Sequence, residues 1–358
     1  MVMGRRPEVK KATAPAAAFA VAGLAAQLAT ALASVPFRKP WNGPAGLLHN
    51  VGMSVTRTVL RAFIGYTTSI PIEEFRSVEI LIDGICRRAL PPFLKPLGVT
   101  VTETELGGVP ALVYRPRDGA APDTILYLHG GGFIGTSPSM YATFTGWIAH
   151  ETACRVVVPD YRLAPEFPYP ASLLDAVAAY EAILNEGVPA ERLFVAGDSG
   201  GGNLVTSLVV EARRRGMPAP TGLLLFSPEL SLALDEPSIR ENTHRDILPW
   251  NIPVRPYLRG LDPHDARVSS ADADLRGFPP TFVAYGGDEM FRDPIRRFVE
   301  RLENAGVDAT AIEEPAMFHV FPILMPWLDA SGRVYRAVGR FVRARLEAKS
   351  LAAEREQP

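Results

Sequence analysis

From Val99 onward, short β-rich runs alternate with stretches of helical periodicity. Residues 99–106 and 109–115, joined at Gly107-Gly108, predict an antiparallel hairpin. Six later runs have the near-continuous apolar character of buried strands: 124–128, 155–159, 192–196, 221–226, 280–285 and 310–313. Helices are predicted near residues 140–153, 171–186, 201–215, 291–305 and 331–347. The pattern predicts an α/β domain over residues 99–350, with an eight-stranded, mostly parallel sheet covered by helices on both faces.

Two regions depart from this alternation. Residues 230–279 are long, Pro-rich and aromatic, with Pro249-Trp250 and Pro256-Tyr257 among them. An insertion of this length is expected to cover a substrate rather than to form an idle loop. Upstream of the sheet, residues 51–66 and 72–90 have helical patterns that end at a cluster of prolines.

The N-terminal segment, residues 1–36, has three interpretations. Its stretch from Ala12 to Phe37 carries no charge and follows several cations, so a cleaved signal peptide and a transmembrane helix both fit. Its large side chains instead repeat at steps of three and four, which places them on one helical face: Val21, Leu24, Leu28, Leu32 and Val35. A one-sided stripe favours a helix that lies on a partner, in a groove or on a membrane surface. Cytoplasmic, membrane-surface and exported locations therefore all remain open.

Composition excludes several classes of protein. Lys+Arg minus Asp+Glu is 37 − 39 = −2, so the net charge gives no reason to expect a nucleic-acid partner. The two cysteines, Cys86 and Cys154, cannot build a disulfide framework or a Cys-rich zinc site. Hydrophobic residues make up 47% of the chain, which predicts a large core.

The segment Gly197-Asp198-Ser199-Gly200-Gly201 has the G-x-S-x-G pattern of a nucleophile elbow. It follows a predicted strand and precedes a helix with Leu204, Val205, Leu208 and Val209 on one face. This strand–turn–helix context predicts that Ser199 projects its hydroxyl above the carboxyl edge of the sheet. The alternative, a plain Ser/Gly helix start, lacks a reason for so many glycines.

A second glycine-rich loop, His129-Gly130-Gly131-Gly132, follows the strand predicted at 124–128. Loops of this HGGG type supply backbone N–H groups to an oxyanion in lipases and esterases. Gly131 and Gly132 are the predicted donors, with the N–H of Gly200 as a third. A phosphate-binding loop is the alternative, but no Gly-Lys-Ser/Thr sequence follows.

A general base and its acidic partner are predicted near the last two strands. His319 follows the final strand, and the order Ser…Asp…His is the one expected for this fold. Asp288, in Gly286-Gly287-Asp288, comes directly after the strand at 280–285 and is the predicted acid. Asp293 precedes Pro294 and is instead predicted to cap a helix.

Together with Asp160-Tyr161-Arg162-Leu163-Ala164-Pro165-Glu166, these motifs resemble the hormone-sensitive-lipase-like esterases, bacterial family IV of the α/β-hydrolase superfamily. The resemblance covers residues 99–347 and implies an α/β-hydrolase fold, a serine carboxylesterase for short- to medium-chain esters, and no cofactor or metal. It also implies that residues 37–98 form a helical cap. The family usually has Ala at the position of Gly200, and Asp-Pro-Leu-x-Asp where this chain has Asp288-Glu289-Met290-Phe291-Arg292-Asp293.

Substrate-pocket residues and partners follow from this assignment. Four aromatic side chains are predicted to line the pocket: Trp250, Tyr257, Phe318 and Phe321. The predicted partner is a small-molecule ester, with membrane-surface association through residues 12–37 as a further expectation. Monomer and dimer both remain open. Three other functions are compatible with parts of the sequence: an amide hydrolase with the same triad, a non-catalytic binding module, and a membrane-surface scaffold.

Overall fold

The computed structural model describes residues 9–37, 46–117, 123–249 and 252–356. Its eight strands are β1 (Val99–Leu106), β2 (Val109–Pro116), β3 (Thr124–Leu128), β4 (Arg155–Pro159), β5 (Leu193–Asp198), β6 (Gly222–Phe226), β7 (Thr281–Gly286) and β8 (Ala309–Glu314). They form one sheet in the order β1-β2-β4-β3-β5-β6-β7-β8. Strand β2 pairs antiparallel with β1 and β4, and all other pairs are parallel. The predicted hairpin, strand number and mostly parallel sheet are confirmed.

Helices cover both faces of this sheet. They are α5 (Ala142–Thr152), α6 (Ala171–Asn185), α7 (Ser199–Arg214), α10 (Arg292–Asn304), α11 (Phe321–Leu324) and α12 (Asp329–Glu356). Because side chains alternate along a strand, Ile125 and Tyr127 of β3 join the core beneath α5 and α12, while Leu126 and Leu128 join the core beneath α6, α7 and α10. Strands buried on both faces explain why their sequences are continuously apolar.

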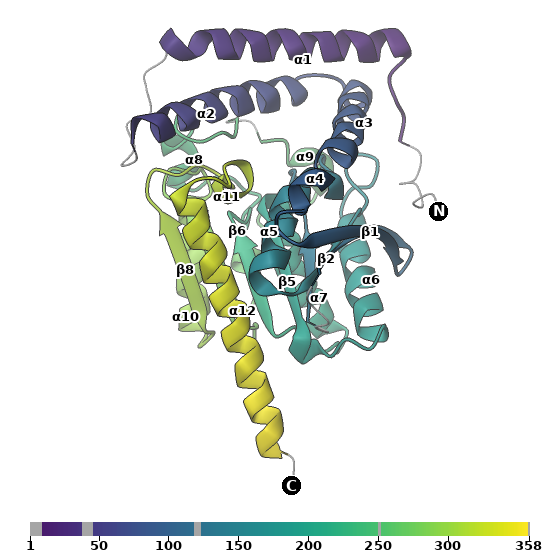
Figure 1. The fold of residues 1–358 in the computed structure, drawn as a ribbon, viewed down its shortest axis with the longest axis vertical. Helices are drawn as coiled ribbons and strands as arrows, with labels where there is room; N and C mark the ends of the chain where they lie inside the picture. The colour runs from purple at the N-terminus through teal and green to yellow at the C-terminus, as the bar shows by residue number, and fades with distance from the viewer. Residues whose placement is uncertain (1–8, 38–45, 118–122, 250–251, 357–358) are drawn as a thin grey trace.

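Four helices precede the sheet: α1 (Ala14–Ser34), α2 (Leu47–Thr67), α3 (Ile72–Ala89) and α4 (Pro91–Leu94). Figure 1 shows α1 lying across α2 and the upper end of α3, above the sheet. Only part of the predicted apolar stripe of α1 packs against the rest of the protein. Leu24 is buried against Val78 of α3, with Val21 and Leu28 partly buried beside it, but Leu32 is 51% exposed.

The inward face of α1 approaches α2 closely. The Tyr66 hydroxyl donates to the Ala20 carbonyl over 2.8 Å. A Cβ at Gly23 would lie 2.3 Å from the same hydroxyl oxygen, so a larger residue would displace the Tyr66 hydroxyl from this position. By length and composition, the segment Ala14–Phe37 is also the one helix of the described residues that could cross a membrane, with a mean hydropathy of 1.8 and 17% of its most apolar stretch buried.

The described residues of the insertion at 230–279 include the short α-helices α8 (Pro237–Glu241) and α9 (Arg255–Leu258). Its residues Leu248, Ile252 and Pro256, together with residues of α2 and α3, line a cavity above the carboxyl ends of β3 and β5. The carboxyl edge of a parallel sheet is where open α/β folds place their binding sites. The fold therefore brings the predicted motifs together at this edge.

Candidate active site

Ser199 occupies the sharp turn between β5 and α7. Its backbone φ is +51°, a left-handed conformation that is strained for a side-chain-bearing residue and is maintained by its surroundings. Gly201 explains why the turn needs glycine, since a Cβ there would lie 2.1 Å from the Leu128 carbonyl oxygen of β3. Strand and helix thus approach too closely for any other residue. The elbow predicted from the sequence is present in the structure.

His319 lies within hydrogen-bonding distance of the serine. Its Nε2 is 2.9 Å from the Ser199 Oγ, although the two residues are 120 positions apart in the chain. The ring is 2% exposed and packs edge-on against Phe291, with centroids 5.0 Å apart. Burial lowers the pKa of the imidazole well below its usual range, so the ring is neutral and able to accept the serine proton.

The carboxylate beside the His319 ring nitrogen Nδ1 is that of Glu289, not that of the predicted Asp288. Glu289 Oε2 is 4.0 Å from His319 Nδ1, and the Glu289 side chain is fully buried. Asp288 instead faces Arg245, a 62% exposed side chain, with 3.2 Å between the Arg245 guanidinium and Asp288 Oδ1. The geometry therefore places Glu289, rather than Asp288, beside the ring of His319.

The backbone after β7 explains this difference. The Asp288 N–H donates to the Met317 carbonyl, and the Glu289 N–H donates back to the Gly286 carbonyl. This tight turn directs Asp288 outward and the next side chain inward. The spacing of the family pattern could have revealed it. Counting back from Asp293, the first acid of a five-residue Asp-Pro-Leu-x-Asp pattern falls on Glu289.

Glu289 is held in place before any substrate arrives. Its Oε2 accepts hydrogen bonds from Ser227 Oγ, at 2.6 Å, and from the Gly286 N–H, at 3.0 Å. Its Oε1 and the Nδ1 of His319 have no hydrogen-bond partner among the described residues. Burial, with nearby Asp246 as a second cause, raises the pKa of Glu289. A 4.0 Å separation is longer than a hydrogen bond, as is common in unliganded sites, where catalytic contacts are often loose.

Asp246, in the insertion, is a site residue that the sequence analysis missed. Its Oδ1 accepts from the His319 N–H at 2.9 Å, and its Oδ2 accepts from the Met290 N–H at 2.7 Å. It therefore connects the loop carrying His319 to the loop carrying Glu289. Burial raises the pKa of this carboxyl to about 6. Asp246 lies in an irregular segment far from any recognised motif, so the sequence carried no signal for it.

The predicted oxyanion loop lies directly beside Ser199. Gly131 and Gly132 have φ values of +115° and +59°, and both line the cavity that contains Ser199 and His319. Asp198, adjacent to the nucleophile, fixes the start of the loop. Its Oδ1 accepts from the Gly130 N–H at 2.9 Å. None of the described residues accepts a hydrogen bond from the N–H of Gly131 or Gly132.

Gly200 faces the same loop from the helix side. A Cβ at this position would lie 3.4 Å from the Gly132 Cα and 3.3 Å from the Phe133 ring. These are tight but tolerable contacts, which agrees with the alanine that the family usually has here. As the second residue of α7, Gly200 has an N–H without an intrahelical acceptor, available to an anion.

Two neighbouring side chains hold the loop. The His129 ring stacks on Tyr161, with centroids 4.3 Å apart, and its Nδ1 lies 2.9 Å from Thr136 Oγ1. The Tyr161 hydroxyl donates to the His129 carbonyl. His129 and Tyr161 therefore hold the glycine-rich loop in place.

A buried arginine joins α3 to this loop region. Arg76 of α3 makes a bidentate pair with Glu166, at 3.0 and 2.7 Å, and its guanidinium also donates to the carbonyls of Ile134 and Ala164. Arg76 pairs with Glu79 as well, at 2.9 Å. Helix α3 is thus connected to the glycine-rich loop after β3 by charge-assisted hydrogen bonds.

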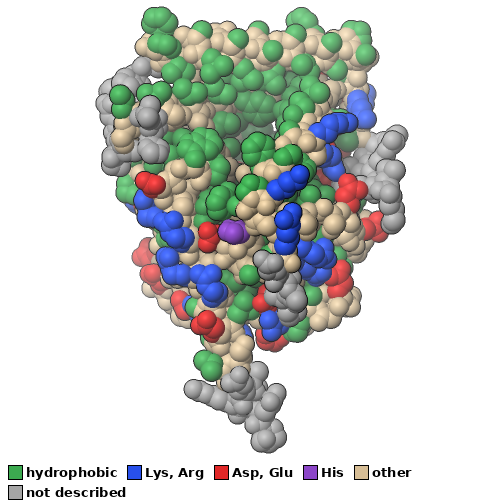
Figure 2. All heavy atoms as spheres, in the orientation of Figure 1, with side chains coloured by type: hydrophobic (Ala, Val, Ile, Leu, Met, Phe, Trp, Pro, Cys, Tyr) green, Lys and Arg blue, Asp and Glu red, His purple; other side chains and the backbone are tan. Residues whose placement is uncertain are grey.

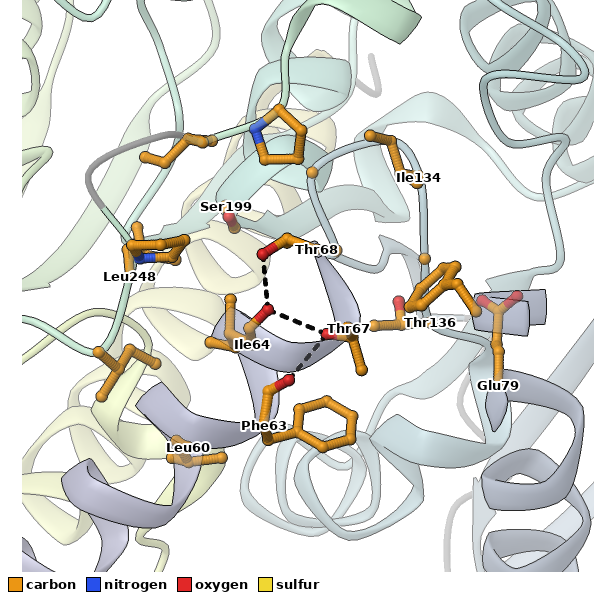
Figure 3. A pocket seen from close by; sticks show the side chains of 18 of the residues that line it. Leu60, Phe63, Ile64, Thr67, Thr68, Glu79, Ile134, Thr136, Ser199 and Leu248 are labelled. Atoms are coloured by element: carbon orange, nitrogen blue, oxygen red, sulfur yellow. Dashed lines mark hydrogen bonds between the residues drawn. The ribbon is translucent and has the colours of Figure 1, made fainter. Parts of the chain in front are cut away.

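The cavity above Ser199 has a volume of about 440 Å³ and a largely apolar lining. Figure 3 shows Ser199 facing it, with Leu60, Phe63 and Ile64 of α2 and Leu248 of the insertion around it. Of the predicted pocket aromatics, the three that the structure describes are not part of this lining. Their true positions are in the core: Tyr257 stacks on Phe133 with centroids 3.8 Å apart, and Phe318 and Phe321 are fully buried beneath α12.

Trp250 and Asp293 are the remaining residues for which the sequence analysis made a prediction. Trp250 lies outside the described residues. Asp293 falls in the first turn of α10 rather than at its N-cap, and its Oδ2 accepts from the Ser238 N–H of α8, so it caps a neighbouring helix. Across the residues that the structure describes, no group of three or more His, Cys, Asp or Glu side chains could hold a metal ion.

Comparisons with known proteins agree with this geometry. A family described as having the α/β-hydrolase fold matches residues 125–323. The carboxylesterase NlhH of Mycobacterium tuberculosis is 33% identical over 75% of this chain and 90% of its own length. An esterase of Acinetobacter venetianus is 28% identical over 80% of this chain and 94% of its own. A hormone-sensitive lipase from a metagenome library, solved as a crystal structure, is 32% identical with a TM-score of 0.72, covering 81% of this chain and 98% of its own. The chain therefore belongs to the α/β-hydrolase family, among its hormone-sensitive-lipase-like esterases, and is a carboxylic ester hydrolase.

Proposed function

We propose that the protein hydrolyses short- to medium-chain carboxylic esters through an acyl-enzyme, with Ser199, His319 and Glu289 as its triad. The single observation that carries this proposal is the 2.9 Å contact between Ser199 Oγ and His319 Nε2, beside the free N–H groups of the glycine loop. In this mechanism Ser199 attacks the ester carbonyl while His319 takes its proton. His319 then protonates the leaving alcohol, and water, activated by the same ring, releases the acid.

Glu289 has two tasks in this mechanism. It holds the imidazole with its proton on Nδ1, and it stabilises the imidazolium that forms when Ser199 loses its proton. The N–H groups of Gly131, Gly132 and Gly200 donate hydrogen bonds to the developing oxyanion. Loss of one such donor typically costs about 3 kcal/mol of transition-state stabilisation.

The cavity supports a small apolar acyl or alcohol group. Its volume of about 440 Å³ falls within the range of roughly 300–1,000 Å³ that is typical of small-molecule pockets. The side-chain hydroxyls of Thr67 and Thr68 donate hydrogen bonds to backbone carbonyls of helix α2, as Figure 3 shows. The α2 wall is therefore effectively apolar, which suits an alkyl chain.

The test is turnover of p-nitrophenyl esters of increasing chain length by the wild type and by Ser199→Ala. The variant should remain folded and lose up to about 10⁶-fold in kcat. Ser69→Ala, which removes an exposed hydroxyl at the end of α2, is the matched control and should retain full activity. Ser199→Ala activity within tenfold of the wild type would end the proposal.

We also propose that the outer surface of α1 rests on a lipid membrane. Figure 2 shows this surface without Lys, Arg, Asp or Glu side chains. Phe19 is 78% exposed there, Leu32 51%, and Phe37, just beyond the helix, 90%. Lys10, just before α1, pairs with Glu73 at 3.4 Å, but its side chain is 84% exposed and can also reach an anionic headgroup.

Flotation of the full chain with vesicles of anionic and of neutral phospholipid tests this arrangement. The double variant Phe19→Glu/Leu32→Glu should lose vesicle binding while it retains turnover of a soluble ester. The control Leu174→Glu places the same charge on α6, at a 43% exposed leucine, and should still float. Wild-type protein that never floats, or a double variant that floats equally well, would contradict the proposal.

A further inference from the structure

The cavity wall next to the nucleophile contains a carboxyl group that the mechanism does not use. Glu229, just beyond β6, lines the same cavity as Ser199 and is 1% exposed. Its Oε1 has no hydrogen-bond partner, and no hydrogen bond or ion pair within the described parts of the chain involves its side chain. Buried polar groups in native proteins are almost always satisfied, so an exception at a binding site requires an explanation.

The backbone of Glu229 is fixed on both sides. Its N–H donates to the Ser199 carbonyl over 2.9 Å, and its own carbonyl accepts from Asn203 Nδ2 over 2.8 Å. Asn203 donates equally to Val268 of the insertion, at 2.8 Å. The backbone of Glu229 is therefore held directly against the nucleophile elbow, and its side chain extends from there into the wall of the cavity.

No structural role accounts for the charge of this residue. Burial raises its pKa to about 8, and none of the cations in the described part of the chain compensates it. Tyr257, stacked on Phe133 behind the cavity wall, is the group that it influences electrostatically. At neutral pH the carboxyl is therefore mainly protonated, a form that offers one O–H donor and one carbonyl acceptor. A buried neutral acid of this kind can serve as a hydrogen-bonding group in an apolar site.

We propose that Glu229 binds a neutral polar group of the substrate, one that carries an O–H or an N–H near the ester bond. This inference rests on the proposed esterase function and specifies its substrate class: esters with a hydroxyl or amide group on the acyl or the alcohol side. Such a group would satisfy both the donor and the acceptor of the Glu229 carboxyl. An unsubstituted alkyl ester would leave them unpaired, and sites built for a hydrogen bond discriminate strongly against ligands that lack it.

Matched esters test the proposal. The pairs are p-nitrophenyl butyrate with p-nitrophenyl 3-hydroxybutyrate for the acyl side, and ethyl butyrate with 2-hydroxyethyl butyrate for the alcohol side. The measured quantity is the ratio of kcat/KM within each pair. We expect the wild type to prefer the hydroxylated ester in at least one pair, by about tenfold or more.

Two variants assign that preference to Glu229. Glu229→Met removes the hydrogen-bonding atoms at similar length and should abolish the preference, whereas Glu229→Gln retains a donor and an acceptor and should keep most of it. Glu300→Met, at an exposed residue of α10, is the control and should leave the ratio unchanged. Absence of a preference in the wild type, or an equal ratio in Glu229→Met, would overturn the inference and indicate that the carboxyl binds only water. Neither result would touch the esterase proposal, which depends on Ser199→Ala.

Discussion

Two variants can decide the identity of the triad acid: Glu289→Gln and Asp288→Asn. Each replaces one carboxylate oxygen by an amide nitrogen. In Glu289→Gln, the Ser227 hydroxyl and the Gly286 N–H both donate to the oxygen that faces His319, so the carboxamide oxygen should take that position. The variant would then keep the imidazole in the correct tautomer and lose only the negative charge. This differs from a protease triad in which the Asp→Asn change produces the wrong tautomer and a loss of about 10⁴-fold.

The expected magnitude follows from the geometry. The imidazolium favours the charged form of Glu289 as it develops, and two unit charges 4.0 Å apart interact by about 4 kcal/mol at an effective dielectric constant of about 20. Losing that interaction when the imidazolium forms corresponds to about a 10³-fold decrease in kcat. Asp288→Asn removes only a pair with the exposed Arg245, and such pairs contribute about 1 kcal/mol or less to stability and nothing to the reacting atoms.

The assay is kcat for p-nitrophenyl butyrate at neutral pH, with thermal melting to confirm that both variants fold. Asp288→Asn is the matched control and should stay within a few-fold of the wild type. If Asp288→Asn were the inactive variant and Glu289→Gln the active one, the acid assigned from the structure would be wrong and the sequence-based prediction would be restored.

Three further predictions follow from particular contacts. Gly201→Ala should abolish activity or folding, because its Cβ would lie 2.1 Å from the Leu128 carbonyl, whereas Gly200→Ala should keep activity within about tenfold; melting curves and kcat separate them. Arg76→Met should lower the melting temperature, since breaking a buried ion pair costs roughly 3–5 kcal/mol, and equal stability would show that the Arg76 contacts are dispensable. Because the pKa of Glu229 is raised to about 8, the folded protein retains a proton that the unfolded chain releases above about pH 4.3, so stability declines with rising pH up to about 8. The free energy of unfolding of Glu229→Gln relative to the wild type, measured in urea, should therefore be more favourable at about pH 8 than at about pH 5. A difference between the two proteins that stays constant with pH would contradict this.

The sequence by itself predicted the sheet and placed Ser199 and His319 together at one edge of it. Strand runs and the glycine-rich turns are local signals, since a sharp strand-to-helix turn and a loop with positive φ require glycine wherever they occur. Ser199 and His319 could be identified because each follows a predicted strand, and parallel strands bring their carboxyl ends to one edge. The same reasoning placed Asp288 at that edge but could not decide which of two adjacent carboxylates turns inward.

That choice depends on tertiary structure. The hydrogen bond from the Asp288 N–H to the Met317 carbonyl joins two loops 29 positions apart and rotates Glu289 toward the base. The predicted pocket aromatics that the structure describes lie in the core for a related reason. An aromatic residue in a loop can face a cavity or the core, and only tertiary packing decides which. Asp246 and Glu229 belong to no local pattern at all. Their roles depend on how deeply each side chain is buried and on which hydrogen-bond partners lie near it in the folded chain. Neither burial nor partners can be read from a short stretch of sequence.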